Sequence, residues 1–126
     1  MGSQLALAYA SKYPQMVSGL VLTGLPLFDS KGDYPARVVI DTVRNNWQSF
    51  SRSLEEVVIS YNPYPDLQSV KADTVLIFGN KDMIAVDVTE NLKRLQGKKH
   101  RVKIVSGTHH VPLEHPKVIA DTVLSL

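Results

Sequence analysis

The sequence predicts an α/β fold with a parallel three-stranded sheet, on the basis of two observations. Three short apolar runs, at 17–23, 74–78 and 101–105, have the length and composition of buried strands. The segments between them carry helical patterns, and strands connected through helices pair in parallel by right-handed crossovers. The expected order is helix, strand, two-helix insertion, strand, helix, strand and helix.

The composition is that of one ordinary globular domain. The chain has 126 residues, of which 44% are hydrophobic and 21% charged, with a net charge of +2. The basic residues between 93 and 103 fit a solvated helix end, so we expect no nucleic-acid partner. Without cysteine there is no disulfide or thiolate nucleophile. The apolar run at 5–10 is too short for a membrane span and has no basic segment before it, which favours a cytoplasmic location.

The first two elements are a helix and a strand. Residues 3–13 are apolar on nearly every side, which predicts a largely buried helix that Pro14 ends. Residues 17–23 form a continuous apolar run, typical of a strand covered on both faces, and Gly24 and Pro26 end it.

An insertion interrupts the alternation at 27–70 and is predicted to form a lid of two helices. The first spans about 35–48. Ser53 and Glu56 form a capping box that predicts the start of the second helix, which the turn residues at 62–66 are expected to end. The whole chain, 1–126, is therefore predicted to be a single partial domain that contains this lid.

Regular alternation resumes in the last third of the chain. Residues 74–78 form a second buried strand, 87–97 a helix between a capping box and a glycine, and 101–105 a strand with a wetter face at the sheet's edge. The last helix begins at Pro116, and three of its residues are predicted to face the core: Ile119, Val123 and Leu126.

An acid and a histidine each follow one of the last two strands. Asp82 lies in the loop that follows the strand at 74–78, and His109 lies in the loop that follows the strand at 101–105. In a parallel sheet these two loops emerge at the carboxyl ends of neighbouring strands, where open α/β sheets build their sites. An acid that orients an imidazole is the supporting half of a nucleophilic triad.

Three segments resemble motifs of the α/β-hydrolase fold family. Gly79-Asn80-Lys81-Asp82 resembles the family's acid turn, and 106–116 resembles its histidine loop. Residues 1–7 are similar to those that follow the serine in the family's G-x-S-x-G elbow. The resemblance covers nearly the whole chain apart from the insertion, and it implies part of a hydrolase sheet with flanking helices.

The resemblance also implies a Ser-Asp-His type triad with Asp82 and His109 as two of its members. Met1 then occupies the position after the nucleophile, and its backbone N–H would be an oxyanion donor. The chain is therefore expected to be the carboxyl-terminal half of a hydrolase, inactive without an upstream nucleophile. Its substrate would be a small apolar molecule with an ester or related acyl bond. No cofactor is implied, and the histidine pair at 109–110 lacks the spacing of a zinc site, so no metal is expected.

Several alternatives stay open. Asp29 is a rival acid, because some family members carry the acid at that place. His110 is expected to line the pocket or pack below it, and Ser3 is expected to be a first-turn residue of the helix and not the nucleophile. Carboxylesterase, lipase, thioesterase, C–C hydrolase and epoxide hydrolase activities all fit. The alternative function is a non-catalytic, truncated interaction module, and self-association through the bare edge of the strand at 19–23 is expected.

Overall fold

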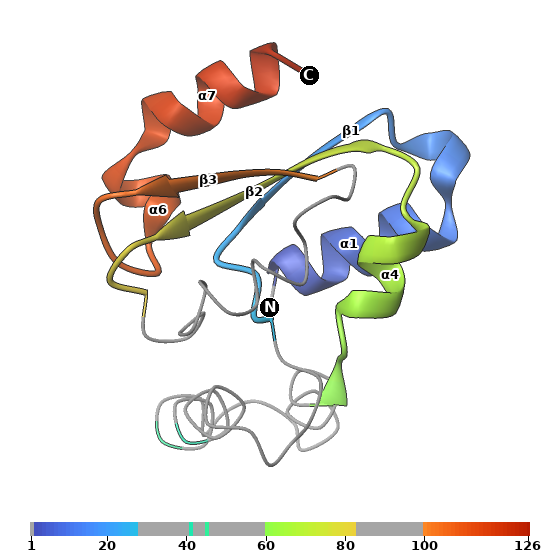
Figure 1. Cartoon of the computed structure of the whole chain (residues 1–126), viewed down its shortest axis with the longest axis horizontal. Helices are drawn as coiled ribbons and strands as arrows, with labels where there is room; N and C mark the ends of the chain where they lie inside the picture. The colour runs from blue at the N-terminus through green and yellow to red at the C-terminus, as the bar shows by residue number, and fades with distance from the viewer. Residues whose placement is uncertain (1, 28–40, 42–44, 46–59, 83–99) are drawn as a thin grey trace.

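Three parallel strands form the centre of the fold (Figure 1). The computed structural model of the chain describes residues 2–27, 41, 45, 60–82 and 100–126. The described elements are, in order, α1 (Gly2–Lys12), the 3-10 helix η1 (Pro14–Met16), β1 (Gly19–Thr23), α4 (Tyr64–Ser69), β2 (Asp73–Gly79), β3 (His100–Val105), α6 (Val111–Glu114) and α7 (Pro116–Leu124). The strands pair in parallel in the order β1-β2-β3, which confirms the predicted α/β class.

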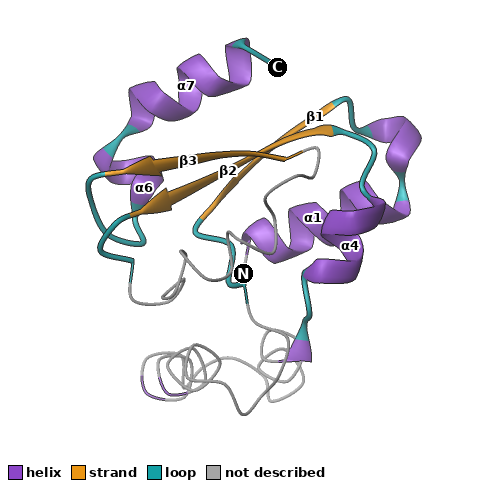
Figure 2. Ribbon diagram, viewed as in Figure 1, coloured by secondary structure: helices purple, strands orange, loops and turns teal. Residues whose placement is uncertain are grey.

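Helices lie on both faces of this sheet (Figure 2). α1 and α4 cover one face, and α7 lies on the other. β2 is the central strand, and its side chains alternate between the faces. Leu76 and Phe78 pack in the cluster that includes α1, whereas Val75 and Ile77 pack with Val111 of α6. A strand buried on both sides explains why this run has no polar residue between 75 and 78.

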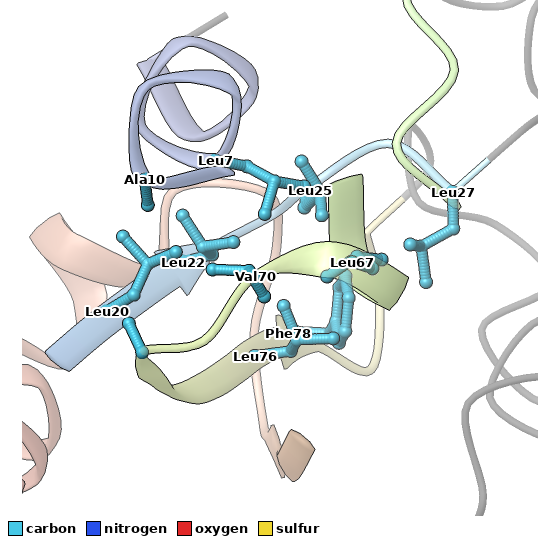
Figure 3. Packing of buried hydrophobic residues seen from close by; sticks show 11 residues of the cluster. Leu7, Ala10, Leu20, Leu22, Leu25, Leu27, Leu67, Val70, Leu76 and Phe78 are labelled. Carbon is cyan, nitrogen blue, oxygen red and sulfur yellow. The ribbon is translucent and has the colours of Figure 1, made fainter. Parts of the chain in front are cut away.

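The larger apolar core lies between α1, α4 and the sheet (Figure 3). Its buried members come from both helices, from β1, from β2 and from the connecting segments: Leu7, Ala10, Leu20, Leu22, Leu25, Leu27, Leu67, Val70, Ala72, Leu76 and Phe78. Each fully buried leucine or phenylalanine stabilises the fold by roughly 1.5–3 kcal/mol relative to an exposed one. This packing fixes α1 against β1, with the start of the helix on the side to which the strands point.

The prediction that the first helix is largely buried was wrong for one of its faces. Gln4, Leu7 and Ala10 are buried, but Leu5 and Tyr9 are 56% and 49% exposed. In the described part of the chain, α1 packs on the sheet and on α4 through a single face, which leaves the opposite apolar face in solvent.

The turn residues at 62–66 separate two helical segments: Ser60 is helical, 61–63 are not, and α4, which was not predicted, begins at Tyr64. Prolines are tolerated in a first turn, where their missing N–H has no helical partner. Pro63 is the N-cap of α4, and the side chain of Asn62 accepts a hydrogen bond from the Tyr64 N–H at 3.0 Å. α4 packs on the core through Leu67. The lid helices predicted before it fall almost entirely on 28–40, 42–44 and 46–59, outside the described residues, as does the helix predicted at 87–97.

The inward face of α7 differs from the predicted one. Ile119 is half-buried, but Val123 and Leu126 are exposed and Thr122 is completely buried. The Thr122 hydroxyl donates to the Val118 carbonyl at 2.7 Å and accepts from the Lys103 ammonium at 2.8 Å. Because its polar group is satisfied, threonine takes the core position. No helix among the described residues is both long and apolar enough to cross a membrane.

Candidate active site

The loops that follow β2 and β3 are joined by hydrogen bonds. The Asn80 N–H donates to the Val105 carbonyl at 2.9 Å, and the Lys81 N–H donates to the Gly107 carbonyl at 2.8 Å. In return, the Gly107 N–H donates to the Asn80 side-chain oxygen at 3.1 Å. These contacts fix the acid turn relative to the histidine loop, because each bond joins one loop to the other.

Asp82 and His109 meet at this junction. His109 Nδ1 lies 2.9 Å from Asp82 Oδ2. The Asp82 side chain is fully buried, whereas the His109 side chain is 32% exposed. An ionised carboxylate only accepts hydrogen bonds, so the Nδ1 proton is donated to Asp82 and Nε2 is left as an acceptor. The arrangement orients an imidazole whose free nitrogen can take up a proton.

Gly24, directly after β1, lies close to the side chains of both His109 and Asp82. Its φ of +57° belongs to the left-handed region, and its N–H donates to the Ile77 carbonyl at 2.9 Å. A Cβ at this position would lie 2.7 Å from Cε1 and 2.8 Å from Nδ1 of His109, and 3.4 Å from Oδ2 of Asp82. The sequence indicated only that Gly24 ends a strand; its role in making room for the imidazole depends on contacts between distant residues.

Glu114, at the end of α6, binds the histidine loop. Its carboxylate accepts a hydrogen bond from the Thr108 N–H at 2.8 Å and another from the Thr108 hydroxyl. The His115 ring bonds the Ser106 carbonyl nearby. The two hydrogen bonds from Thr108, the side-chain one first, hold the pKa of the Glu114 carboxyl below its usual value. Nothing in the sequence pattern indicates this role for Glu114.

A cavity of about 280 Å³ opens beside the imidazole. Its described lining comes from the start of α1, the end of β1, the histidine loop and α6: Gly2, Ser3, Thr23, His109, His110, Pro112 and Leu113. Ser3 lies in the first turn of α1, as expected from the motif register. The His110 ring stands edge-on to that of His109, with 6.0 Å between centroids.

The remaining candidate residues lie outside the described part of the chain. Met1, the expected oxyanion donor, and Asp29, the rival acid, are both among the residues whose positions are not described. Within residues 2–27, 60–82 and 100–126, no three His, Asp or Glu side chains form a group that could hold a metal ion.

Comparison with known proteins identifies the fold. No protein-family model matches the sequence, and no curated protein is significantly similar to it. Many solved structures resemble nearly the whole chain, among them the following three.

E-2-(acetamidomethylene)succinate hydrolase matches with a TM-score of 0.70 and 11% identity, over 98% of this chain and 62% of its own length. An alpha/beta hydrolase from the sediment metagenome of the Mar Chica lagoon, Morocco, matches with a TM-score of 0.64 and 24% identity, over 98% and 56%. The thioesterase domain from the curacin biosynthetic pathway matches with a TM-score of 0.63 and 15% identity, over 97% and 63%. The chain thus spans 56% to 63% of the length of these three structures. With its parallel sheet and its flanking helices, the chain has the α/β-hydrolase fold.

Proposed function

We propose that this chain is part of a hydrolase that cleaves an ester or related acyl bond, with Asp82 and His109 as two members of a Ser-Asp-His type triad. The proposal rests on one observation, the fully buried Asp82 carboxylate 2.9 Å from His109 Nδ1. A carboxylate on Nδ1 fixes the tautomer in which Nε2 accepts a proton, as nucleophilic catalysis requires.

In the proposed reaction, His109 moves one proton between the nucleophile and the leaving group. Nε2 takes the proton of the attacking hydroxyl while its oxygen forms a bond to the carbonyl carbon. The resulting imidazolium is stabilised by the Asp82 carboxylate, which stays ionised. The C–O bond to the leaving alcohol then breaks, and Nε2 returns the proton to that alcohol. Water repeats the sequence and frees the acid.

We place the nucleophile immediately before Met1 and assign the Met1 N–H as an oxyanion donor. Gly2 and Ser3 line the same cavity as His109, so the start of α1 lies at the proposed site. The hydrolase structures that the chain resembles are also longer than this chain. The triad would therefore be completed by residues upstream of the given sequence.

For the substrate we propose a small molecule whose apolar part contacts the apolar residues of an otherwise polar cavity lining. Pro112 and Leu113 contribute an apolar wall next to His109. The similar structures include a thioesterase domain and a meta-cleavage product hydrolase. What they share with the proposal is hydrolysis, and an ester is proposed because an activated hydroxyl attacks its carbonyl carbon, as it does that of a thioester.

The test is hydrolysis of a short p-nitrophenyl ester. We expect residues 1–126 to show no turnover, and the same residues extended by the gene sequence that precedes the Met1 codon to show turnover. Turnover by the extended protein should disappear in His109→Ala, because the base is lost.

Two outcomes would contradict this proposal. Turnover by residues 1–126 that is lost in His109→Ala would mean that the nucleophile lies within the chain, with Ser3 the first residue to replace. An upstream sequence without serine in frame at the nucleophile position would remove the proposed chemistry, and one without aspartate there as well would leave the site without a nucleophile. The latter would favour a non-catalytic interaction module that retains the pocket.

We also propose that residues 1–126 alone self-associate through the β1 edge at 19–23. In the described part of the chain β1 pairs only with β2, and the neighbouring α1 exposes Leu5 and Tyr9. Unpaired strand edges with apolar surroundings recruit other chains. Light scattering should show a dimer or larger species, and Leu5→Lys should reduce it. Leu124→Lys, an equally apolar exposed site on α7, is the matched control. A monomer that stays monodisperse for days would contradict self-association.

A further inference from the structure

Glu114 is connected to both neighbours of His109. It binds Thr108 directly, and the Thr108 hydroxyl in turn binds the backbone of His110. The carboxylate accepts from the Thr108 N–H at 2.8 Å and from the Thr108 hydroxyl at 2.5 Å. The same hydroxyl oxygen accepts a hydrogen bond from the His110 N–H at 3.3 Å. We call this set of Thr108, His110 and Glu114 the histidine clasp. His109 lies between its two bound backbone groups.

The carboxylate is itself held in place by α6. The Glu114 N–H donates to the His110 carbonyl at 3.1 Å. Val111, at the start of the same short helix, is completely buried and packs with Val75 and Ile77 of β2. Glu114 therefore connects the histidine loop to a helix that is anchored on the central strand, which carries the acid turn at its end.

The backbone directly before the clasp passes through Gly107, which the acid turn holds from one side through Asn80 and Lys81. Gly107 has a φ of +144°, and a Cβ there would collide with the Glu114 carboxylate, which lies directly over it. Glycine loses more conformational freedom on folding than any other residue, so a loop through it needs external contacts to stay ordered. The clasp supplies such contacts one residue before the imidazole.

From these contacts we infer that Glu114 is a positioning residue that keeps the His109 imidazole on Asp82. The inference rests on the proposed function, in which this imidazole is the base, and deepens it. Glu114 does not touch the reacting atoms. It fixes the backbone of Thr108 and His110, and through them the direction in which the His109 side chain leaves the loop. A bidentate acceptor is suited to this because it binds an N–H and a hydroxyl at once.

NMR spectroscopy of residues 1–126 tests the inference without any turnover. The readouts are the exchange rates of the Thr108 and His110 amides and the resonance of the His109 Nδ1 proton. In Glu114→Ala we expect both amides to exchange about fivefold faster, as the loss of one hydrogen bond of ordinary strength predicts. The Nδ1 proton signal should broaden, because the imidazole no longer stays on Asp82. Glu114→Gln keeps one acceptor oxygen and should restore part of the protection.

Matched variants separate positioning from general stability. Asp121→Asn removes a carboxylate on α7 that pairs with Lys117 at 2.7 Å in solvent, and it should leave all three signals unchanged. Thr108→Val removes only the hydroxyl of the clasp and should broaden the Nδ1 signal, whereas Thr108→Ser should keep it sharp. If Glu114→Ala does not fold, the two Thr108 variants decide the question.

Three results would overturn the inference: unchanged amide exchange in Glu114→Ala, a sharp Nδ1 signal despite faster exchange, or a sharp signal in Thr108→Val. If the NMR signals of residues 1–126 follow the expected pattern while the extended protein does not hydrolyse esters, that combination counts against the proposed function and not against the positioning role of Glu114.

Discussion

If the proposed function holds, Asp82→Asn in the protein extended upstream of Met1 is expected to lower p-nitrophenyl ester turnover by about four orders of magnitude. The amide has nearly the same shape as the carboxylate but can donate to His109 Nδ1, where the carboxylate only accepts. The imidazole would then carry its proton on Nε2 and could not take one from the nucleophile. The fully buried position of the Asp82 side chain adds to the effect, because water cannot replace the missing charge.

Asp73→Asn is the matched control for this experiment. It makes the same chemical change at the opposite end of β2, where the carboxylate pairs with Arg101 at 2.8 Å in an exposed position. Exposed ion pairs contribute little, so turnover should stay close to that of the unmodified protein. If Asp82→Asn retained full turnover, another acid would have to orient the imidazole, and Asp29 would be the next residue to replace.

The second large effect is expected from Gly24→Ala, which should both destabilise the fold and separate His109 from Asp82. A side chain in the left-handed region costs roughly 1–2 kcal/mol. Its Cβ would also lie within 2.8 Å of two ring atoms of His109, a contact that real structures avoid. Together with overpacking of roughly 1–3 kcal/mol, the free energy of unfolding should fall by about 3 kcal/mol. Urea unfolding measures this loss, and the His109 Nδ1 proton signal reports on the hydrogen bond.

Gly19→Ala, at the start of the same strand, tests whether the effect is local. Its Cβ would meet the side chain of Leu126 at 2.9 Å, but that side chain is the last of the chain and can move. We expect a smaller loss of stability and an unchanged Nδ1 signal. An intact signal in Gly24→Ala would show that the imidazole tolerates a side chain beneath it, and Gly24 would then have no part in the site.

The strands could be predicted from the sequence because each depends on local composition. The run from Val75 to Phe78 is apolar at every position, which only a strand covered on both faces requires, and β2 is indeed the central strand. β3 is an end strand of the described sheet, as predicted for 101–105, but residues 101–104 are all exposed, so the predicted contrast between a wetter and a drier face is not observed. The prolines near residue 63 indicated a helix end but not the start of α4 at Tyr64, because a proline is compatible both with the end of one helix and with the start of the next.

The candidate site divides in the same way. Asp82 and His109 could be singled out because each follows a recognisable strand, and parallel neighbours place such loops at one edge. The two residues that support this pair, Gly24 and Glu114, could not be singled out from the sequence. Gly24 acts through its contact with His109, 85 positions away, and Glu114 acts through its hydrogen bonds with Thr108, 6 positions away. Neither contact leaves a periodic pattern in the sequence.

The sequence by itself determined the class of fold, the parallel order of its strands and the pairing of an acid with a histidine, because hydrophobic periodicity and strand ends are local properties. The tertiary structure alone decided which face of α1 is buried and that Thr122 and not Val123 enters the core. It also decided how closely the backbone at Gly24 approaches the His109 ring. Those features depend on the space between elements, and that space is defined only once the helices have packed against the sheet.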